Sequence, residues 1–452
     1  MVRFSHSYSG LFVLINARTS TVGLFCSLIV IAPANAAPDA QEREKALSEN
    51  LAVAMATHNH KEIDRIKGAI LSRLDAPPAT ESPEHYEAFQ NDQEFLQQFY
   101  SQTRQKKKET LEQLSRKFVQ FCRERSWWMT ERKVAAKDIP QPLRTVASMI
   151  RGMLAIARAY PDCRNEATMI ARSGGDYLLS CSSEAGFAGA PFPYWRGRKG
   201  RLGDLSEKLS LKLEKTQSLN KCLVNGWLVV PSLPCEYYFD TGSVGEALLE
   251  LYEATADSRY LKWVESASSW AKAKPISPNY NYNSFIATMD AKLFLATGDI
   301  GYLKQAVERT TSGVIAGEIE NGPYAGHFID PHNERMVYRK IITHGLIVVS
   351  TALAKDKSGA ITQSDKERIY RATALATAAL IEQMKVRGFS TSLIEIFSDT
   401  KAARQAGAAL PEPSAQTLAL HEGHCLKLIV SGRGISLPEL GLLLEQLAQA
   451  TK

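Results

Sequence analysis

The sequence predicts an all-α fold built from helical hairpins, and two observations support this. Residues 238–272 read as one hairpin, because apolar residues recur at helical spacing after Ser243 and a second helix follows a short break at 255–257. The hairpin recurs, since Tyr260 and Tyr302 lie 42 residues apart in matching segments. One hairpin cannot bury its apolar stripe alone, so the repeat predicts a stacked or closed array.

We expect the first helix of this hairpin to begin at Ser243. Ser243 and Glu246 form a capping-box pattern, in which a hydroxyl and a carboxylate satisfy free backbone amides at a helix start. A polar aromatic cluster precedes this helix, and a similar cluster lies 42 residues later. The clusters contain Tyr238 and Asp240, then Tyr280 and Tyr282. These segments should form loops that converge on one rim of the array.

The sequence resembles the hairpin signature of six-hairpin glycosidase-like proteins in three segments. These are the motif Tyr-Phe-Asp-Thr-Gly at 238–242, the helix end at 249–255 and the segment 257–261. This resemblance covers about a tenth of the chain and implies an (α/α)6 toroid. Such proteins include unsaturated glucuronyl hydrolases, sugar epimerases and some polysaccharide lyases. The resemblance therefore implies activity on carbohydrate and leaves the reaction open.

Residues 1–36 have the pattern of an export signal. A short apolar core at 22–31 follows Arg3 and Arg18 without any acidic residue, and Ala34-Asn35-Ala36 fits a small-x-small cleavage site. The core is too short to span a bilayer, which takes about 20 apolar residues. We expect cleavage after Ala36 and a periplasmic or secreted protein without a membrane span. An uncleaved anchor or a misassigned start codon is the alternative.

Two regions follow the signal. Residues 37–135 are charged and helical and read as an N-terminal helical extension, and residues 136–452 read as the toroid-like domain. Ten helices, or five hairpins, are counted from Leu143 onwards, with the last two at 415–431 and 437–450. One more hairpin, from the region 106–125, would complete six.

The net charge limits the kinds of molecule that the protein is expected to bind, and the cysteines offer a candidate disulfide. The formal net charge of +6 falls to +4 without the two signal arginines, which is too mild to indicate nucleic acid. A basic excess suits an anionic polysaccharide or an ordinary surface. Six cysteines remain after cleavage, and Cys222 with Cys235 bracket one loop as a candidate disulfide, with buried free thiols as the alternative.

The segment 181–236 interrupts the helical rhythm with glycine, proline, aromatic and basic residues. A long irregular connection within a compact domain is often functional. Within it, Trp195 and Arg196 combine an aromatic face, which can stack on a sugar ring, with a guanidinium that can hold a carboxylate. They are candidate substrate-binding residues, or else part of a packed loop with a basic rim.

Two aspartates are the leading candidates for chemistry, because glycosidic cleavage usually needs two carboxyl groups. Asp240 lies before a predicted toroid helix, where it either acts in catalysis or caps the helix. Asp290 shares an apolar stripe with Ile286 and Leu293, so its carboxyl needs a partner or a raised pKa. A structural hydrogen bond explains Asp290 equally well.

Further polar residues are candidates for substrate contact or proton transfer. His327, in the loop 322–334, is a candidate proton donor, while His344 and Arg339 share one predicted helix and could face a uronate. Alternatively, His344 is a structural histidine in the core, and Arg339 forms an ion pair with an acidic residue at a helix end. The residues predicted to bind substrate are Trp195, Arg196, Tyr238, Tyr280, Tyr282, Arg339 and His344. Irregular ligand spacing in the 322–334 loop does not indicate a metal site, and we expect no metal and no cofactor.

The sequence thus predicts an exported enzyme acting on a polysaccharide or oligosaccharide with acidic sugars, with Asp240, Asp290 and His327 as catalytic candidates. Hydrolysis is preferred over elimination or epimerisation of a uronate. A toroid that binds glycan or a partner protein at the cell envelope without catalysis is the opposing hypothesis. No phosphate-binding glycine loop, nucleophile elbow or paired Cys-x-x-Cys site occurs in the sequence.

Overall fold

The computed structural model has an all-α fold, which confirms the predicted fold class. The structure describes residues 38–71, 97–99, 101–129, 142–181, 192–194, 197, 201–224, 227–228, 238–329, 333, 335–387, 393–430 and 440–450. The predicted export signal, Cys235, Trp195 and Arg196 lie outside these residues. Among the described residues no two cysteines form a disulfide, and Cys122, Cys163, Cys181 and Cys425 are buried thiols.

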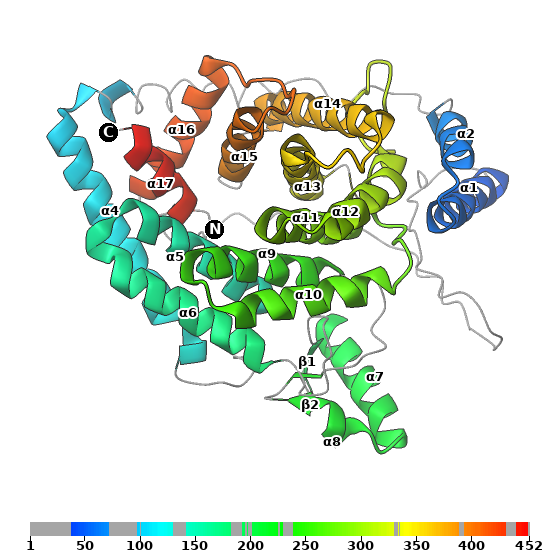
Figure 1. Cartoon of the computed structure of the whole chain (residues 1–452), viewed down its shortest axis with the longest axis horizontal. Helices are drawn as coiled ribbons and strands as arrows, with labels where there is room; N and C mark the ends of the chain where they lie inside the picture. Colours follow the sequence, from blue (N-terminus) through cyan, green and yellow to red (C-terminus); the bar gives the residue numbers. More distant parts are fainter. Residues whose placement is uncertain are drawn as a thin grey trace.

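Six helices pack against one another in cyclic order near the centre of the molecule (Figure 1). Each contacts the next in the series, and the last contacts the first. They are α5 (Pro142–Ala159), α9 (Tyr238–Thr255), α11 (Tyr280–Thr297), α13 (Met336–Lys355), α15 (Leu393–Gln405) and α17 (Leu440–Ala450). Because α9, α11 and α13 are consecutive in this order, the hairpins predicted from the 42-residue period are neighbours in space.

A second set of helices packs outside the first. Each inner helix from α5 to α13 packs against the outer helix that follows it in the chain, and α4 packs against α17 and α6. The outer helices are α6 (Arg164–Ser180), α10 (Ser258–Lys272), α12 (Ile300–Gly313), α14 (Gln363–Arg387), α16 (Ala415–Val430) and α4 (Arg104–Arg125). The helix expected from region 106–125 therefore lies beside the last inner helix, as completion of a sixth hairpin requires.

One inner helix was missed by the sequence prediction. Helix α15 begins at Leu393 and separates α14 from α16, whereas the predicted hairpins passed from residue 383 to residue 415 without it. The apolar residues Leu393, Ile394, Ile396 and Phe397 are buried, so tertiary packing stabilises this short helix. The final hairpins are consequently α15 with α16, which meet where the rings of Phe397 and His421 pack edge to face, and α17 with α4.

The repeated hairpin has the same local structure in both copies. Asp257 and Asp299 are the N-caps of α10 and α12, and their Oδ1 atoms accept hydrogen bonds from Arg259 N at 3.0 Å and Gly301 N at 2.8 Å. The predicted capping box at Ser243 is wrong, because α9 begins at Tyr238 and Ser243 lies inside it. The clusters expected in loops therefore occupy the first turns of α9 and α11.

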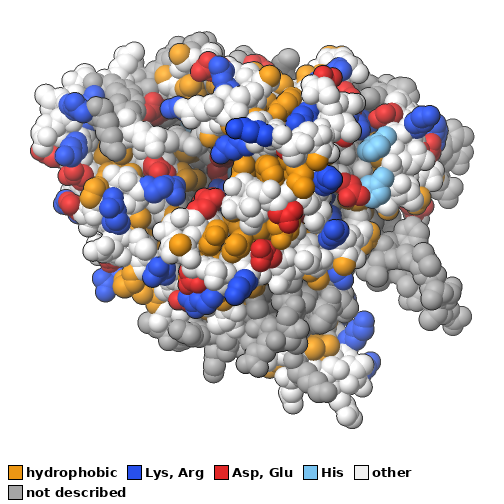
Figure 2. Space-filling view, in the orientation of Figure 1, with side chains coloured by type: hydrophobic (Ala, Val, Ile, Leu, Met, Phe, Trp, Pro, Cys, Tyr) orange, Lys and Arg blue, Asp and Glu red, His pale blue; other side chains and the backbone are white. Residues whose placement is uncertain are grey.

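The N-terminal hairpin of α1 (Pro38–Ala56) and α2 (His60–Leu71) packs against α12 and the short 3-10 helix η4 (Ile315–Gly317). Its apolar side chains join one core with η4, α12 and α13. At the contact, the buried Lys67 donates to Ile315 O and to Glu320 Oε1, both at 3.1 Å. Figure 2 shows histidine side chains gathered on this side, and elsewhere basic and acidic side chains intermingle on the visible face.

Part of the segment expected to be irregular is ordered. It forms α7 (Arg201–Lys215), α8 (Leu219–Cys222) and a small antiparallel sheet in which β3 (Trp227–Leu228) lies between β1 (Phe192–Pro193) and β2 (Leu223–Val224). Leu213 of α7 and Leu228 of the sheet form a small separate core. In Figure 1 this subdomain projects away from the ring beyond α10.

Among the described helices, α13 is long and apolar enough to cross a membrane, but two thirds of it is buried in the protein (67%). It packs against α11, α14 and α15.

Candidate functional site

The candidate site is a cavity of about 190 Å³ enclosed by the six inner helices. All six helices contribute, and the lining residues come from the first half of each helix except Arg151 and Gly152, which lie just past the middle of α5. The lining consists of Arg144, Ala147, Ser148, Arg151, Gly152, Ser243, Glu246, Phe285, Thr288, Lys340, Ile341, His344, Glu395 and Leu442. Helix N-termini carry partial positive charge, which favours an anionic group at this side.

Glu246 of α9 lies at the centre of the charged lining. Its Oε1 is 2.6 Å from Lys292 Nζ, 3.3 Å from Arg151 Nη2 and 2.9 Å from His344 Nε2. Burial by itself would raise the pKa of Glu246, but these three cationic partners outweigh it and hold the pKa well below its usual range. Glu246 is therefore an ionised carboxylate and a poor proton donor.

A second layer of ion pairs extends the network deeper into the ring. Glu250 Oε1 lies 2.8 Å from Arg151 Nε and 2.9 Å from Lys292 Nζ. Glu250 and Lys292 are absent from the cavity lining, and Glu250 follows the lining residue Glu246 by one helical turn. Buried charges persist only when paired, so these residues hold Arg151 and Glu246 in place.

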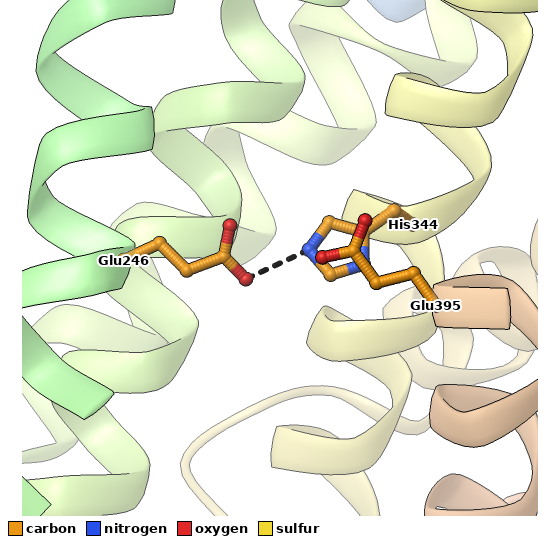
Figure 3. Close-up of side chains that lie close together, drawn as sticks. All are labelled: Glu246, His344 and Glu395. Carbon is orange, nitrogen blue, oxygen red and sulfur yellow. Dashed lines mark hydrogen bonds and ion pairs between the residues drawn. The ribbon is translucent and has the colours of Figure 1, made fainter. Parts of the chain in front are cut away.

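Glu395 and His344 complete the charged wall. Glu395 of α15 pairs with Arg151, and its Oε2 lies 3.2 Å from Lys340 Nζ. His344 Nδ1 lies 2.7 Å from Asp399 Oδ2, one turn further along α15. Figure 3 shows Glu246 from α9, His344 from α13 and Glu395 from α15 converging on one point.

The convergence of Glu246, His344 and Glu395 resembles the donor set of a metal site, since one potential ligand atom from each lies within 4.8 Å of the others. Their other contacts do not fit a metal ion. Both imidazole nitrogens already face carboxylates, and Arg151 pairs with both glutamates. A divalent cation would lie beside this guanidinium, so we assign the cluster no metal.

Asp240 lies in the first turn of α9, next to the cavity wall. Its Oδ1 is 3.2 Å from Arg144 Nε, and the Arg144 guanidinium stacks on the Phe239 ring at 4.3 Å from its centroid. Burial raises the pKa of Asp240 to about 6, although Arg144 opposes the shift. A carboxyl that is protonated in part near neutral pH can donate a proton.

Asp290 does not face the cavity. Its Oδ1 accepts a hydrogen bond of 2.6 Å from Ser268 Oγ on the outer helix α10. Burial raises the pKa of Asp290 to about 7. The structure therefore separates Asp290 from the cavity lining and gives it the structural partner that the sequence left open.

The aromatic candidates fall into two groups. Tyr238 and Tyr280 are fully buried: the hydroxyl of Tyr238 donates to Pro275 O at 2.7 Å, and Tyr280 packs against Phe328. Tyr282 is half-buried and packs against Phe239, which contacts Arg144. Tyr282 is thus the one of these three tyrosines that the structure connects to the cavity wall.

Two further candidates, Arg339 on α13 and His327 in the segment before it, lie away from the cavity lining. Arg339 is fully buried and donates to Gln383 Oε1 of α14 at 3.0 Å, while His327 Nδ1 lies 3.5 Å from Arg339 Nη1. Neither lines the cavity. Of the candidates predicted from the sequence, His344 lines the cavity, whereas Asp240 and Tyr282 lie beside its wall, Asp240 against Arg144 and Tyr282 against Phe239. Asp290, His327 and Arg339 lie elsewhere.

Sequence reasoning missed most of the charged network at and behind the cavity wall. Arg151, Lys292, Lys340, Glu395 and Asp399 were not singled out, and Glu246 was interpreted as a helix cap. Two of them carry a signal that could have been used, a lone charge between apolar residues: Lys292 between Ala291 and Leu293, and Glu395 between Ile394 and Ile396. Such a charge needs a buried partner.

No protein-family model, no curated protein and no solved structure matches this chain.

Proposed function

We propose that the six inner and six outer helices form a closed (α/α)6 toroid. The cyclic packing from α5 through α17 back to α5 supports closure. The contribution of every inner helix to one cavity supports it independently. In such a ring the loops before the inner helices lie on one rim, as predicted from the 42-residue period.

The cavity is proposed to bind an acidic saccharide, and the charge of its lining carries this proposal. Of the charged lining residues, Arg144, Arg151, Lys340 and His344 are basic, whereas Glu246 and Glu395 are acidic. An arginine at the wall offers a bidentate donor to a carboxylate, and Ser148 and Thr288 offer hydroxyls to sugar hydroxyls. The resemblance to six-hairpin glycosidase-like proteins points to the same class of ligand.

The proposed reaction is hydrolysis of a glycosidic bond. One carboxyl must donate a proton and the other must be ionised. Asp240, with a pKa raised by burial to about 6, fits the donor. Glu395 fits the ionised carboxylate, because burial is outweighed by Arg151 and Lys340, which lower its pKa.

Elimination or epimerisation of a uronate is the second candidate. Its support is the cationic lining, which can neutralise a uronate carboxylate and make the neighbouring proton more acidic. These reactions also need a base close to that proton. Both nitrogens of His344 contact carboxylates, so this histidine cannot serve as the base, and the reaction is placed second.

A substrate screen tests the proposal. The chain without residues 1–36 is incubated with uronate-containing and neutral polysaccharides and oligosaccharides, and reducing ends and the absorbance of unsaturated uronates are followed together. New reducing ends without that absorbance support hydrolysis, and both signals together support elimination. Isotope exchange at the uronate C5 detects epimerisation. Binding of acidic saccharides without any of these signals favours a glycan-binding protein.

Export to the periplasm or the medium is proposed from the pattern of residues 1–36 alone. N-terminal sequencing of protein recovered outside the cytoplasm should begin at Ala37. Recovery of the intact N-terminus in the membrane fraction would favour an uncleaved anchor.

A further inference from the structure

We propose that Asp399 is a positioning residue that, together with Glu246, holds His344 as a fixed cation in the cavity wall. Asp399 belongs to α15 and is absent from the cavity lining, so it acts through His344 and not on a ligand. The positive charge of His344 is inferred from the contacts of its ring alone. The effect of this charge on substrate choice rests on the proposed function.

The two contacts of the imidazole determine its protonation. His344 Nδ1 lies 2.7 Å from Asp399 Oδ2, and Nε2 lies 2.9 Å from Glu246 Oε1. A neutral imidazole has one N–H, whereas an ionised carboxylate only accepts hydrogen bonds. Two such carboxylates at hydrogen-bond distance from both nitrogens therefore require both nitrogens to donate, and the ring is an imidazolium.

The surrounding charges agree with this assignment. The acidic groups of the network are Glu246 and Glu250 on α9 with Glu395 and Asp399 on α15, and the basic groups are Arg151 on α5, Lys292 on α11 and Lys340 on α13. Four acids face three cations, so an imidazolium brings the network to neutrality. Burial by itself would lower the pKa of His344, but Glu246 and Asp399 outweigh it and raise the pKa to about 10.

This arrangement gives His344 a specific role. Because both nitrogens are engaged, the ring neither accepts a proton from a substrate nor directly donates a hydrogen bond to it. It instead supplies a positive charge that persists through neutral pH beside Lys340 and Glu395. If the proposed function holds, this charge favours an acidic sugar over a neutral one of the same size.

The charge of His344 is measured by NMR of the histidine ring nitrogens as a function of pH in the protein without residues 1–36. Loss of the signal in H344Q assigns it among the eight histidines that remain after removal of His6 with residues 1–36. We expect the wild-type ring to remain protonated at pH 8. D399N should lower its titration midpoint by about one to two pH units, which is the usual effect of one close opposite charge, and D399E should restore it. D162N, at an exposed ion pair with Arg116, is the matched control and should change nothing.

A wild-type ring that is neutral at pH 7, or a midpoint that D399N leaves unchanged, overturns the inference. Binding of glucuronate and of glucose is then measured by calorimetry at pH 7 and pH 9. We expect D399N to lose affinity for glucuronate between these pH values more steeply than the wild type. Failure of the wild type to bind glucuronate at all, with the expected titration, sinks the proposed acidic ligand and leaves the role of Asp399 intact.

Discussion

At the residue scale, three buried or half-buried acids in the same ring differ in protonation because their partners differ. Asp240 has one arginine at 3.2 Å and Asp290 has a serine hydroxyl at 2.6 Å, so burial dominates and raises the pKa of both. Glu246 contacts three cationic side chains, which outweigh burial and lower its pKa. The number of opposite charges within reach therefore decides which acid can donate a proton near neutral pH.

Asp240→Asn is expected to abolish most of the activity on a saccharide substrate. The amide cannot donate the required proton, and loss of a general acid costs on the order of a hundredfold or more in kcat. In the wild type the rate should fall as pH rises through about 6, because the donor loses its proton. Steady-state kinetics with the substrate from the screen measure both effects.

The stability of this variant should change by less than about 1 kcal/mol, because the amide avoids the cost of a buried charge while weakening one ion pair. A folded Asp240→Asn protein with full activity would leave Asp240 as a partner of Arg144 only. Asp162→Asn, at the exposed pair with Arg116, serves as the control for activity.

Asp290→Asn should change how stability depends on pH. The pKa of Asp290 is raised from 3.8 to about 7 in the folded protein, so the folded state holds its proton more tightly than the unfolded state. Wild-type stability therefore falls as pH rises from about 4 to about 7, and the amide removes this loss. Between pH 4 and pH 8, the free energy of unfolding of the variant should therefore rise by about 2 to 4 kcal/mol relative to that of the wild type.

Denaturant unfolding of both proteins at several pH values measures this difference. Parallel curves for the wild type and Asp290→Asn would show that Asp290 has an ordinary pKa in the folded protein.

At the element scale, the two copies of the hairpin share the same hydrogen bonds at the turn between their inner and outer helices. In both copies an aspartate caps the outer helix, and the preceding threonine bonds back into the inner helix: Thr255 Oγ1 donates to Leu251 O and Thr297 Oγ1 to Leu293 O, both at 2.7 Å. These local bonds depend on residue types that the repeat preserves. That is why the 42-residue period was visible in the sequence.

Asp299→Ala should lower the free energy of unfolding by about 1 kcal/mol, because the Gly301 amide at the start of α12 loses its acceptor. Asp299→Asn keeps an acceptor oxygen and should cost much less. Asp299 is exposed and distant from the cavity lining, so activity should not change. Equal destabilisation by alanine and asparagine would contradict capping as its role.

At the scale of the whole molecule, closure of the ring depends on contact between its first and last inner helices. Gly441 of α17 packs against the backbone of Gly152 in α5, and a side chain at Gly441 would collide with the Gly152 carbonyl oxygen. Backbone cannot yield as a flexible side chain can. This contact joins segments almost 300 residues apart in the sequence and lies beside the cavity-lining residue Leu442.

Gly441→Ala should therefore destabilise the protein by about 1 to 3 kcal/mol, as overpacking of a tight contact does. It should also weaken saccharide binding, because α5 supplies Arg144 and Arg151. Gly68→Ala is the control: Gly68 is exposed in α2 with open space around it, and alanine there should stabilise by up to about 1 kcal/mol. Thermal unfolding of the two variants gives the comparison, and a neutral Gly441→Ala would argue against a tight closure.

The sequence by itself determined the all-α class, the hairpin unit and the adjacency of α9 and α11. These follow from helical periodicity and local capping, which act over a few residues and leave a repeated pattern. The sequence also identified His344, which lines the cavity, and Asp240 and Tyr282, which lie beside its wall, but without showing that a cavity exists there.

Only the tertiary structure decided which charges face one another. Glu246, Glu395, Asp399 and Lys292 lie on three helices that are distant in the chain, and their protonation depends on distances that no local pattern encodes. The same holds for Asp290, whose apolar stripe proved to face α10 instead of the cavity. Local spacing fixes which side of a helix a residue occupies, whereas the neighbour on that side is set by packing of the whole ring.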